Sequence, residues 1–240
     1  MSVVLKKRQN TRLVIIQLAA HLFLEDGYSA SSIKKIAKIL KLSPGNITFY
    51  FPSKDHMLAE LVDELFDFQN MMMEQAAEEG KSSLLAYCLE LATIASICEE
   101  DAVAKEFYFA SYSSPYTLAR IRENDTKKTK AVFQEYCPDF TDEDWVSHEN
   151  IVSGIEYATI MTSENTTPLS TQIEQTLDAI LLFYKVPEEI RRKKIEKVLS
   201  MDYRTMGRRI LKEFRDYIDK INETKAKKAP PKKPKKRVRK

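Results

Sequence analysis

Residues 43–50 carry hydrogen-bonding and aromatic side chains in a stretch too short and too polar to form a core. The order Ser-Pro-Gly-Asn predicts the start of a short helix, because Ser is a good N-cap and Pro suits the first helical position. Ile47 can face a core at helical spacing, which leaves Asn46, Thr48 and Phe49 at or near the surface. Such groups suit the reading of base edges and the binding of phosphates.

Two short helices must position these side chains. Ser31 or Ser32 can cap a helix over residues 33–40, and a tight turn at 41–43 leads to the helix that begins with Pro44. A helix-turn-helix unit of this kind can place its second helix in the DNA major groove. The alternative interpretation is an ordinary helical hairpin inside a core.

The rest of the chain predicts an all-α protein. It has five glycines, 43% hydrophobic residues and long segments rich in Leu, Ile, Ala, Glu and Lys, with little strand-like alternation. Proline and glycine residues separate the expected helices. The expected helices span residues 10–25, 33–40, 44–51, 54–79, 82–100, 101–113, 116–136, 142–162, 169–184, 188–199 and 202–222.

Charge is distributed unevenly along the chain. Residues 1–60 have a net charge of +5, residues 61–224 of −12 and residues 225–240 of +10. We expect both basic ends to meet a polyanion. The Lys/Pro-rich segment 225–240 should be disordered. It could hold DNA non-specifically or be a solvated charge run, and binding of RNA or of a membrane surface by this segment stays open.

The sequence argues against several other classes of protein. Cys88, Cys98 and Cys137 have no disulfide or zinc spacing, and the chain lacks a nucleophile elbow, a phosphate-binding glycine loop and any other catalytic constellation. We therefore expect no enzyme, no metal and no cofactor. The apolar run 13–24 lacks a cleavage site and no segment is long enough to span a membrane, which favours a cytoplasmic, nucleoid-associated protein.

The amino-terminal quarter resembles the DNA-binding domain of the TetR family of transcriptional regulators. The resemblance is carried by Ala19, Ala20, Phe23, Gly27, Tyr28, Ile36, Ala37, Leu42, Ser43 and the run from Gly45 to Lys54. The chain departs from the family pattern at Lys41, where the family usually has Gly, and at Thr48, where it prefers Tyr. A left-handed turn at Lys41 would cost about 1–2 kcal/mol.

The resemblance implies a division of the chain and a set of DNA contacts. Residues 9–69 would form the DNA-binding domain, with the helix-turn-helix motif at about 32–51, and residues 70–222 would form a larger helical bundle for effector binding and dimerisation. The implied DNA-contacting residues are Ser32, Ser43, Pro44, Gly45, Asn46, Thr48, Phe49, Tyr50 and Lys54. Asn46 is the best candidate for direct base readout.

The resemblance also implies an unidentified small-molecule effector and a homodimer that binds a pseudo-palindromic duplex. The candidate pocket residues are Met72, Tyr87, Phe107, Tyr108, Tyr112 and Met161. The candidate dimer-interface residues are Ile151, Ile155, Leu177, Ile180 and Leu181. The expected function is that of a ligand-responsive repressor. The alternatives are an architectural protein that binds DNA through its basic tail, and an enzyme or protein-binding module that has lost contact with DNA.

Overall fold

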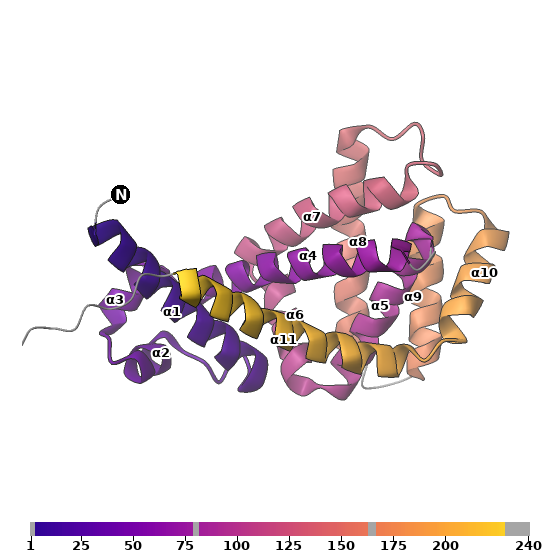
Figure 1. The fold of residues 1–240 in the computed structure, drawn as a ribbon. Coiled ribbons are helices and arrows are strands. Elements are labelled where there is room, and N and C mark those ends of the chain that lie inside the picture. The colour runs from indigo at the N-terminus through magenta and orange to yellow at the C-terminus, as the bar shows by residue number, and fades with distance from the viewer. Residues whose placement is uncertain (1–2, 79–81, 163–166, 229–240) are drawn as a thin grey trace, which may run out of the picture.

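The computed structural model describes residues 3–78, 82–162 and 167–228, and these residues form helices without strands (Figure 1). The expected all-α architecture is confirmed. The eleven helices are α1 (Val3–Glu25), α2 (Ile33–Leu40), α3 (Pro44–Thr48), α4 (Lys54–Glu78), α5 (Ser83–Glu100), α6 (Ala102–Ser113), α7 (Pro115–Phe133), α8 (Asp142–Thr162), α9 (Leu169–Phe183), α10 (Glu188–Leu199) and α11 (Tyr203–Lys228).

A small head of three helices, α1 to α3, lies at one end of the elongated molecule (Figure 1). Its core contains Phe23, Ile36, Ile47, Phe51 and Met57, all of which are buried. These side chains come from α1, α2, α3, the turn after α3 and the start of α4, so the apolar residues spaced along this segment converge on one centre. The short α3 is therefore fixed to the head by its single buried residue and by its flanking turns.

The turn between α2 and α3 has the left-handed geometry that the sequence comparison suggested for Lys41. Lys41 has φ 53° and ψ 42°, and the N–H groups of Lys41 and Leu42 bond to Lys38 O and Ala37 O. These bonds satisfy carbonyl groups that the end of α2 leaves without intrahelical partners. This geometry strains the backbone at Lys41, because the residue has a Cβ atom.

Replacing Lys41 by glycine is therefore expected to stabilise the protein. Removal of the Cβ strain should exceed the entropy that glycine adds to the unfolded chain and raise the free energy of unfolding by about 0.5–1 kcal/mol. Urea denaturation measures this change. The control Lys38→Gly, at an exposed position inside α2, should instead lower stability by about 1 kcal/mol. Equal destabilisation by both variants would contradict the account.

The long helix α4 joins the head to the helical body. The body packs around α5, which lies against α9, α10 and α11. A cluster of aromatic side chains fills the core of the body, where the rings of Phe133 and Tyr184 stack at 4.3 Å and Trp145 and Tyr87 pack beside them. Within the described residues, no helix combines the length and the apolar character needed to cross a membrane.

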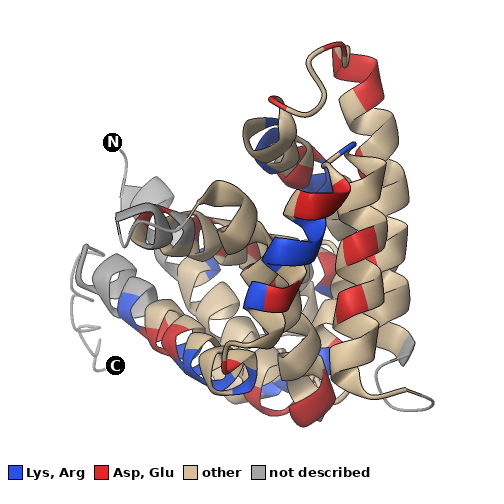
Figure 2. Ribbon diagram, turned by 90° about the vertical axis from the view of Figure 1, so that its right-hand side faces the viewer, with Lys and Arg blue, Asp and Glu red and all other residues tan. Residues whose placement is uncertain are grey.

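Helix α11 runs back from the far end of the body to the head (Figure 1). It crosses α5 closely at Gly207, where a Cβ atom would lie 2.5 Å from Ser96 Oγ. Basic and acidic residues alternate along it (Figure 2), and the side chains of Lys212 and Asp216 form an ion pair at 2.8 Å. Near the head, Arg215 donates a hydrogen bond to Leu24 O at 3.1 Å. The helix therefore belongs to the fold and ends close to α1.

Several helix boundaries differ from the sequence prediction. Helix α1 begins at Val3 rather than at residue 10, α3 ends at Thr48 rather than at residue 51, and α7 ends at Phe133. Residues 225–228, predicted to be disordered, belong to α11, and Lys and Ala are residue types that favour continuation of a helix. Residues 229–240 lie outside the described residues. The predicted domain division at 69/70 falls within the continuous α4 and stays a prediction.

Candidate nucleic-acid interface

The sequence of α3 determines which of its side chains point outward. Ser43 caps the helix by accepting a hydrogen bond from Asn46 N at 3.2 Å, and Pro44 occupies the first helical position. Ile47 is fully buried and anchors the inner face. The remaining predicted contact residues in this segment are exposed, namely Ser43, Pro44, Gly45, Asn46, Thr48 and Phe49. The predicted base-reading groups therefore share the outer face of α3.

Phe49 is the most exposed large apolar side chain among the described residues, with 64% of its surface accessible. Its ring meets the half-buried ring of Tyr50 edge-on at 5.1 Å. Thr48 Oγ donates to Gly45 O at 3.2 Å, which holds the hydroxyl against the helix backbone. Exposed aromatic surface next to polar groups is typical of an interaction surface. Here it lies at the tip of the head.

Comparisons with known proteins agree with this geometry. Residues 15–61, which include α2, α3 and the start of α4, match the model for bacterial regulatory proteins of the tetR family. The helix-turn-helix segment of this chain therefore matches the TetR family. The predicted recognition segment thus coincides with the matched TetR segment.

Two curated relatives from Bacillus subtilis (strain 168) resemble the same end of the chain. The uncharacterized HTH-type transcriptional regulator YuxN is 32% identical over 81 residues, which are 34% of this chain and 28% of the relative. The probable HTH-type transcriptional regulator YttP is 32% identical over 68 residues, which are 28% of this chain and 33% of the relative. The matched part spans a third or less of the length of these relatives.

Solved structures give more remote matches that cover most of the chain. The TetR family protein CprB from S. coelicolor A3(2) is 20% identical, with a TM-score of 0.44, and the match covers 86% of this chain and 99% of CprB. A gamma-butyrolactone receptor described as an ArpA-like protein is 18% identical with a TM-score of 0.39, covering 87% of this chain and 99% of the receptor.

Lys54 does not point outward from the TetR-type head as the prediction required. Its ammonium donates to Tyr28 O at 2.8 Å and to Ser31 O at 3.1 Å, and it lies 3.7 Å from the centroid of the Tyr28 ring. Burial lowers its pKa. Since two of its donors are directed at the turn between α1 and α2, Lys54 helps to position the helix-turn-helix unit, and its assignment as a phosphate contact stays a prediction.

Ser32 lies at the exposed amino-terminal end of α2, where its hydroxyl accepts a hydrogen bond from Lys35 N at 3.1 Å. It therefore caps α2 and leaves the first turn of that helix facing solvent. The exposed lysines Lys34, Lys38 and Lys41 lie on α2 and its turn, next to α3. Their helical spacing places these lysines on a face away from the core, so they extend the candidate interface beyond the predicted residues.

A contact between head and body was missed by sequence reasoning. Glu106 on α6 accepts a hydrogen bond from Ser29 N at 2.6 Å, in the turn between α1 and α2. A Cβ atom on Gly27, which has φ +95°, would lie 2.4 Å from the same carboxylate. The separation of 77 residues between Ser29 and Glu106 gives no local pattern that could have predicted this contact. It couples the body directly to the element that carries α2.

The body contains two neighbouring cavities. The smaller, of about 50 Å³, is lined by Tyr108 and Tyr112 among others, and the larger, of about 320 Å³, is lined by Met72 and Tyr108. Three other predicted pocket residues line neither cavity. Tyr87 and Phe107 are buried core residues, and Met161 is 38% exposed on α8. The helical spacing of Tyr87 and Phe107 reflected core packing rather than a cavity wall.

The predicted dimer-interface residues divide between the core and the surface. Leu177, Ile180 and Leu181 on α9 are fully buried within the single chain, so they pack the body and cannot supply an interface. Ile155 is half-buried, whereas Ile151 on α8 is 50% exposed. The sequence did not single out two further exposed apolar side chains on the same helices, Val146 and Leu182, which are 51% and 57% exposed.

Proposed function

We propose that this protein is a homodimeric transcriptional regulator that binds a specific DNA duplex through α3 and is released from it by a small molecule. The observation that carries the proposal is the outward face of α3, where Asn46, Thr48 and Phe49 are exposed around the buried anchor Ile47. A short helix with such a face can enter the major groove, and Asn46 can pair bidentately with adenine there.

Selection of duplexes from a random library tests this function. Two heads related by a two-fold axis should enrich a pseudo-palindrome with half-sites about one helical turn, roughly 34–36 Å, apart or a multiple of it. The variant Asn46→Ala should relax the preference at one position of each half-site by about 1–3 kcal/mol. Absence of any enriched sequence would contradict the proposal and favour a helical module that has lost contact with DNA.

The ligand response would act through α6. This helix contributes Tyr108 and Tyr112 to the cavities and Glu106 to the contact with the head. A ligand can change DNA affinity only if it binds one arrangement of the two heads better than another. A shift of α6 that accommodates a ligand would move the Glu106–Ser29 contact and with it the position of α2 and α3, which favours the role of a repressor released by its effector.

The proposed dimer interface lies on the exposed apolar side chains of α8 and α9. Leu182→Arg introduces a charge on the surface that also carries Val146 and Ile151. The substitution should raise the dimer dissociation constant at least about tenfold, because a charge that is desolvated without a partner costs several kcal/mol. Analytical ultracentrifugation measures the association. The exposed control Gln134→Arg should leave it unchanged. A dimer of unaltered stability in Leu182→Arg would place the interface elsewhere.

The second candidate function is architectural binding of DNA by the basic tail. It is favoured by the course of α11, which packs against α1 and so brings the start of the tail to the head. Deleting residues 229–240 removes seven Lys and Arg residues. If these residues contact phosphates, the slope of log affinity against log salt should fall in magnitude by up to about 6.

Filter binding to the selected duplex and to an unrelated duplex, over a range of salt concentrations, distinguishes the two functions. A specific regulator that loses its tail should keep its preference for the selected duplex while its binding becomes less sensitive to salt. Loss of nearly all binding to both duplexes would instead support the architectural function.

A further inference from the structure

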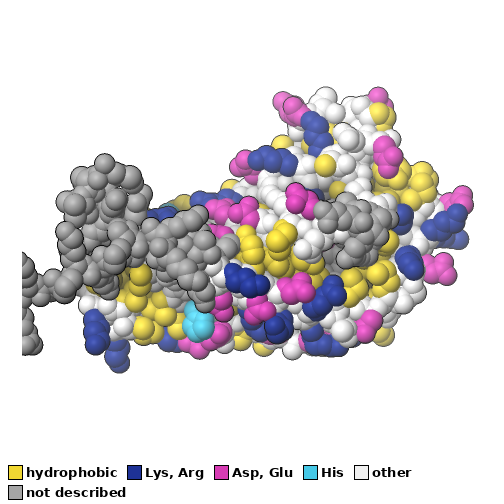
Figure 3. Space-filling model, viewed as in Figure 1, with side chains coloured by type: hydrophobic (Ala, Val, Ile, Leu, Met, Phe, Trp, Pro, Cys, Tyr) yellow, Lys and Arg dark blue, Asp and Glu magenta, His cyan; other side chains and the backbone are white. Residues whose placement is uncertain are grey.

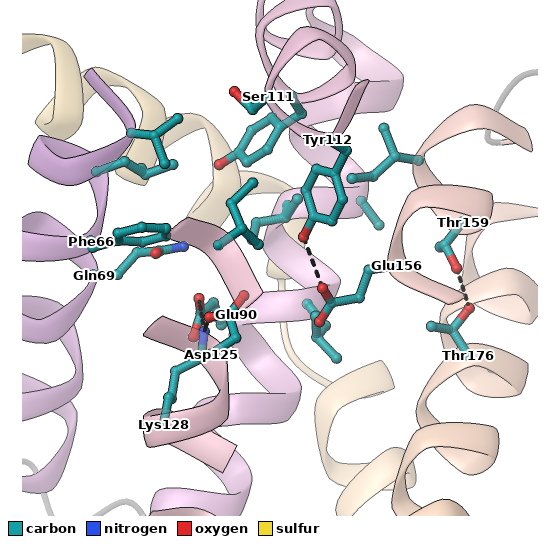
Figure 4. A pocket seen from close by; sticks show the side chains of 18 residues that line it. Phe66, Gln69, Glu90, Ser111, Tyr112, Asp125, Lys128, Glu156, Thr159 and Thr176 are labelled. Carbon is teal, nitrogen blue, oxygen red and sulfur yellow. Dashed lines mark hydrogen bonds and ion pairs between the residues drawn. The ribbon is translucent and has the colours of Figure 1, made fainter. Parts of the chain in front are cut away.

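The smaller cavity of the body is lined by an unusual concentration of carboxyl groups (Figure 4). Glu90 on α5, Asp125 on α7 and Glu156 on α8 all line it. Glu149, two helical turns before Glu156 on α8, lies beside it, and carboxylate oxygens of Asp125, Glu149 and Glu156 lie within 4.8 Å of one another. Glu149 is completely buried and Asp125 is 8% exposed.

Only part of the negative charge that these carboxyl groups carry when ionised is balanced inside the protein. Lys128 is 2.9 Å from Asp125 and 3.0 Å from Glu90, so one ammonium serves two carboxylates. Glu156 accepts a hydrogen bond from Tyr112 Oη at 2.8 Å, and Glu149 from Tyr184 Oη at 3.4 Å. Within the described residues, no ion pair forms to Glu149 or Glu156. The cavity can therefore accept a further positive charge.

Two fully buried polar atoms beside the cluster support this conclusion independently. Glu149 Oε1 and Tyr87 Oη have no hydrogen-bond partner among the described residues. Tyr87 is 1% exposed, its ring lies 6.0 Å from Lys128 Nζ, and the carboxylates of Glu156, Glu149 and Asp125 add to the burial that raises its pKa. A buried polar group without a partner destabilises the fold. A bound cation would give the Glu149 oxygen a partner.

The acidic cavity adjoins the larger one. The two share the lining residues Leu65, Gln69, Glu90, Ile94 and Tyr108. Apart from these residues, the larger cavity is lined mainly by apolar side chains of α4, α5 and α11, including Phe68, Met72, Ile97, Ile210 and Phe214. The combined space thus has a small acidic end and an apolar chamber of about 320 Å³. Such a division suits a ligand with a charged head and a hydrophobic body.

We propose that this space binds an amphiphilic organic cation, with its ammonium group between Glu156, Glu149 and Asp125 and its apolar body in the larger cavity. The aromatic rings of Tyr108 and Tyr112, which line the smaller cavity, can add cation–π attraction. The proposal deepens the proposed function, because it names the chemical class of the effector. A bare divalent ion suits the site less well, since Lys128 already holds Asp125 and the apolar chamber would stay unfilled.

The protonation of the carboxyl groups makes cation binding depend on pH. Burial and neighbouring carboxylates raise the pKa of Glu156 to about 8 and that of Glu149 to about 9. The titratable groups that face them are Tyr87 and Glu90 on α5, Tyr108 and Tyr112 on α6, Asp125 and Lys128 on α7, and Tyr184 after α9. At pH 7 both glutamic acids are mainly protonated, so a bound cation favours their ionised forms and releases protons. Affinity should therefore rise with pH.

Calorimetric titration of the full chain without DNA tests the proposal. The probes are benzyltrimethylammonium, whose charge does not titrate, and neopentylbenzene, its uncharged isostere. The cation should bind at least about tenfold more tightly than the isostere at pH 8, and its dissociation constant should fall by up to about tenfold per pH unit between pH 6 and pH 8. Equal affinity for the two probes, or cation binding that does not vary with pH, would overturn the proposal.

A matched pair of variants tests which carboxyl group binds the positive charge of the probe. Glu156→Gln keeps an acceptor for Tyr112 but should weaken binding of benzyltrimethylammonium at least about tenfold and flatten its pH dependence. Glu143→Gln, exposed near the start of the same helix, should bind as the wild type does. If Glu156→Gln fails to fold, the comparison of the two probes with the wild-type protein still tests whether binding depends on the charge of the ligand.

Further titrations separate this proposal from its alternatives. The protein could instead bind Mn²⁺, lose that binding in Glu149→Gln, and fail to bind the organic cation. This result would overturn the proposal in favour of a metal site. Failure to bind the cation while duplex selection succeeds overturns only the ligand class. Cation binding without duplex selection upholds the site and overturns the proposed function.

Discussion

Replacing Phe49 by aspartate is expected to reduce binding to the selected duplex at least about 100-fold, because a carboxylate would replace an apolar side chain where the protein approaches phosphates. Phe49 is 64% exposed, so the substitution removes little core packing. The free energy of unfolding should change by no more than about 0.5 kcal/mol, as is usual for surface positions. Fluorescence anisotropy with a labelled duplex measures the affinity and urea denaturation the stability.

The control for Phe49→Asp is Ala131→Asp, which adds the same charge at an exposed position near the carboxyl-terminal end of α7. It should bind the duplex within about twofold of the wild type, since it lies away from the head and exposed charges are screened over about 10 Å. Wild-type affinity in Phe49→Asp would show that α3 does not face the duplex. An equal loss in both variants would show a response to net charge alone.

Truncating Phe133 to alanine is expected to destabilise the body by about 3–5 kcal/mol. Phe133 is fully buried at the end of α7, its ring stacks on that of Tyr184 at 4.3 Å and 8°, and it meets the edge of the Tyr87 ring at 5.1 Å. The variant loses both ring contacts and leaves a cavity that tightly packed helices fill only in part. Guanidinium denaturation followed by circular dichroism measures the loss.

The neighbouring exposed residue provides the control for Phe133→Ala. Gln134→Ala should change the free energy of unfolding by less than about 0.5 kcal/mol. A loss below about 1.5 kcal/mol in Phe133→Ala would mean that the site collapses around the smaller side chain or that this cluster contributes little to stability.

Local signals allowed the head to be predicted closely. Ser32 and Ser43 cap helices as their residue types suggested, Lys41 has the left-handed conformation, and Ile47 is the buried anchor of α3. The two caps and the buried anchor depend on a few adjacent residues, whereas the left-handed turn at Lys41 followed from the family pattern, which usually has Gly there. The outward face of α3 follows from them, because a five-residue helix with one buried position leaves the other positions exposed.

Features that depend on long-range packing were predicted less well. The apolar periodicity of α9 does not distinguish a face buried in the same chain from one buried in a dimer, so Leu177 was assigned to the wrong side. Lys54 has the length to reach either phosphates or nearby carbonyl groups, and in the chain alone it bonds to the carbonyl of Tyr28. The cluster of Asp125, Glu149 and Glu156 forms only because α7 packs against α8.

The surface agrees with a division of roles between head and body. Charged side chains of both signs are interspersed along α11 and the adjoining body (Figure 3), so this face offers no continuous basic surface to a duplex. The exposed lysines of α2 instead adjoin α3. Electrostatic attraction to DNA should therefore come mainly from the head, with the sequence of the tail adding cations beyond α11.

Hydroxyl-radical footprinting of the selected duplex tests most directly whether the α3 helices of two protomers bind the duplex together. The wild-type protein should protect two backbone zones on one face of the duplex, centred roughly 34–36 Å or a multiple of that distance apart, and Phe49→Asp should remove both zones together. Uniform protection along the duplex, or two zones that persist in Phe49→Asp, would contradict the claim that the outward face of α3 enters the major groove.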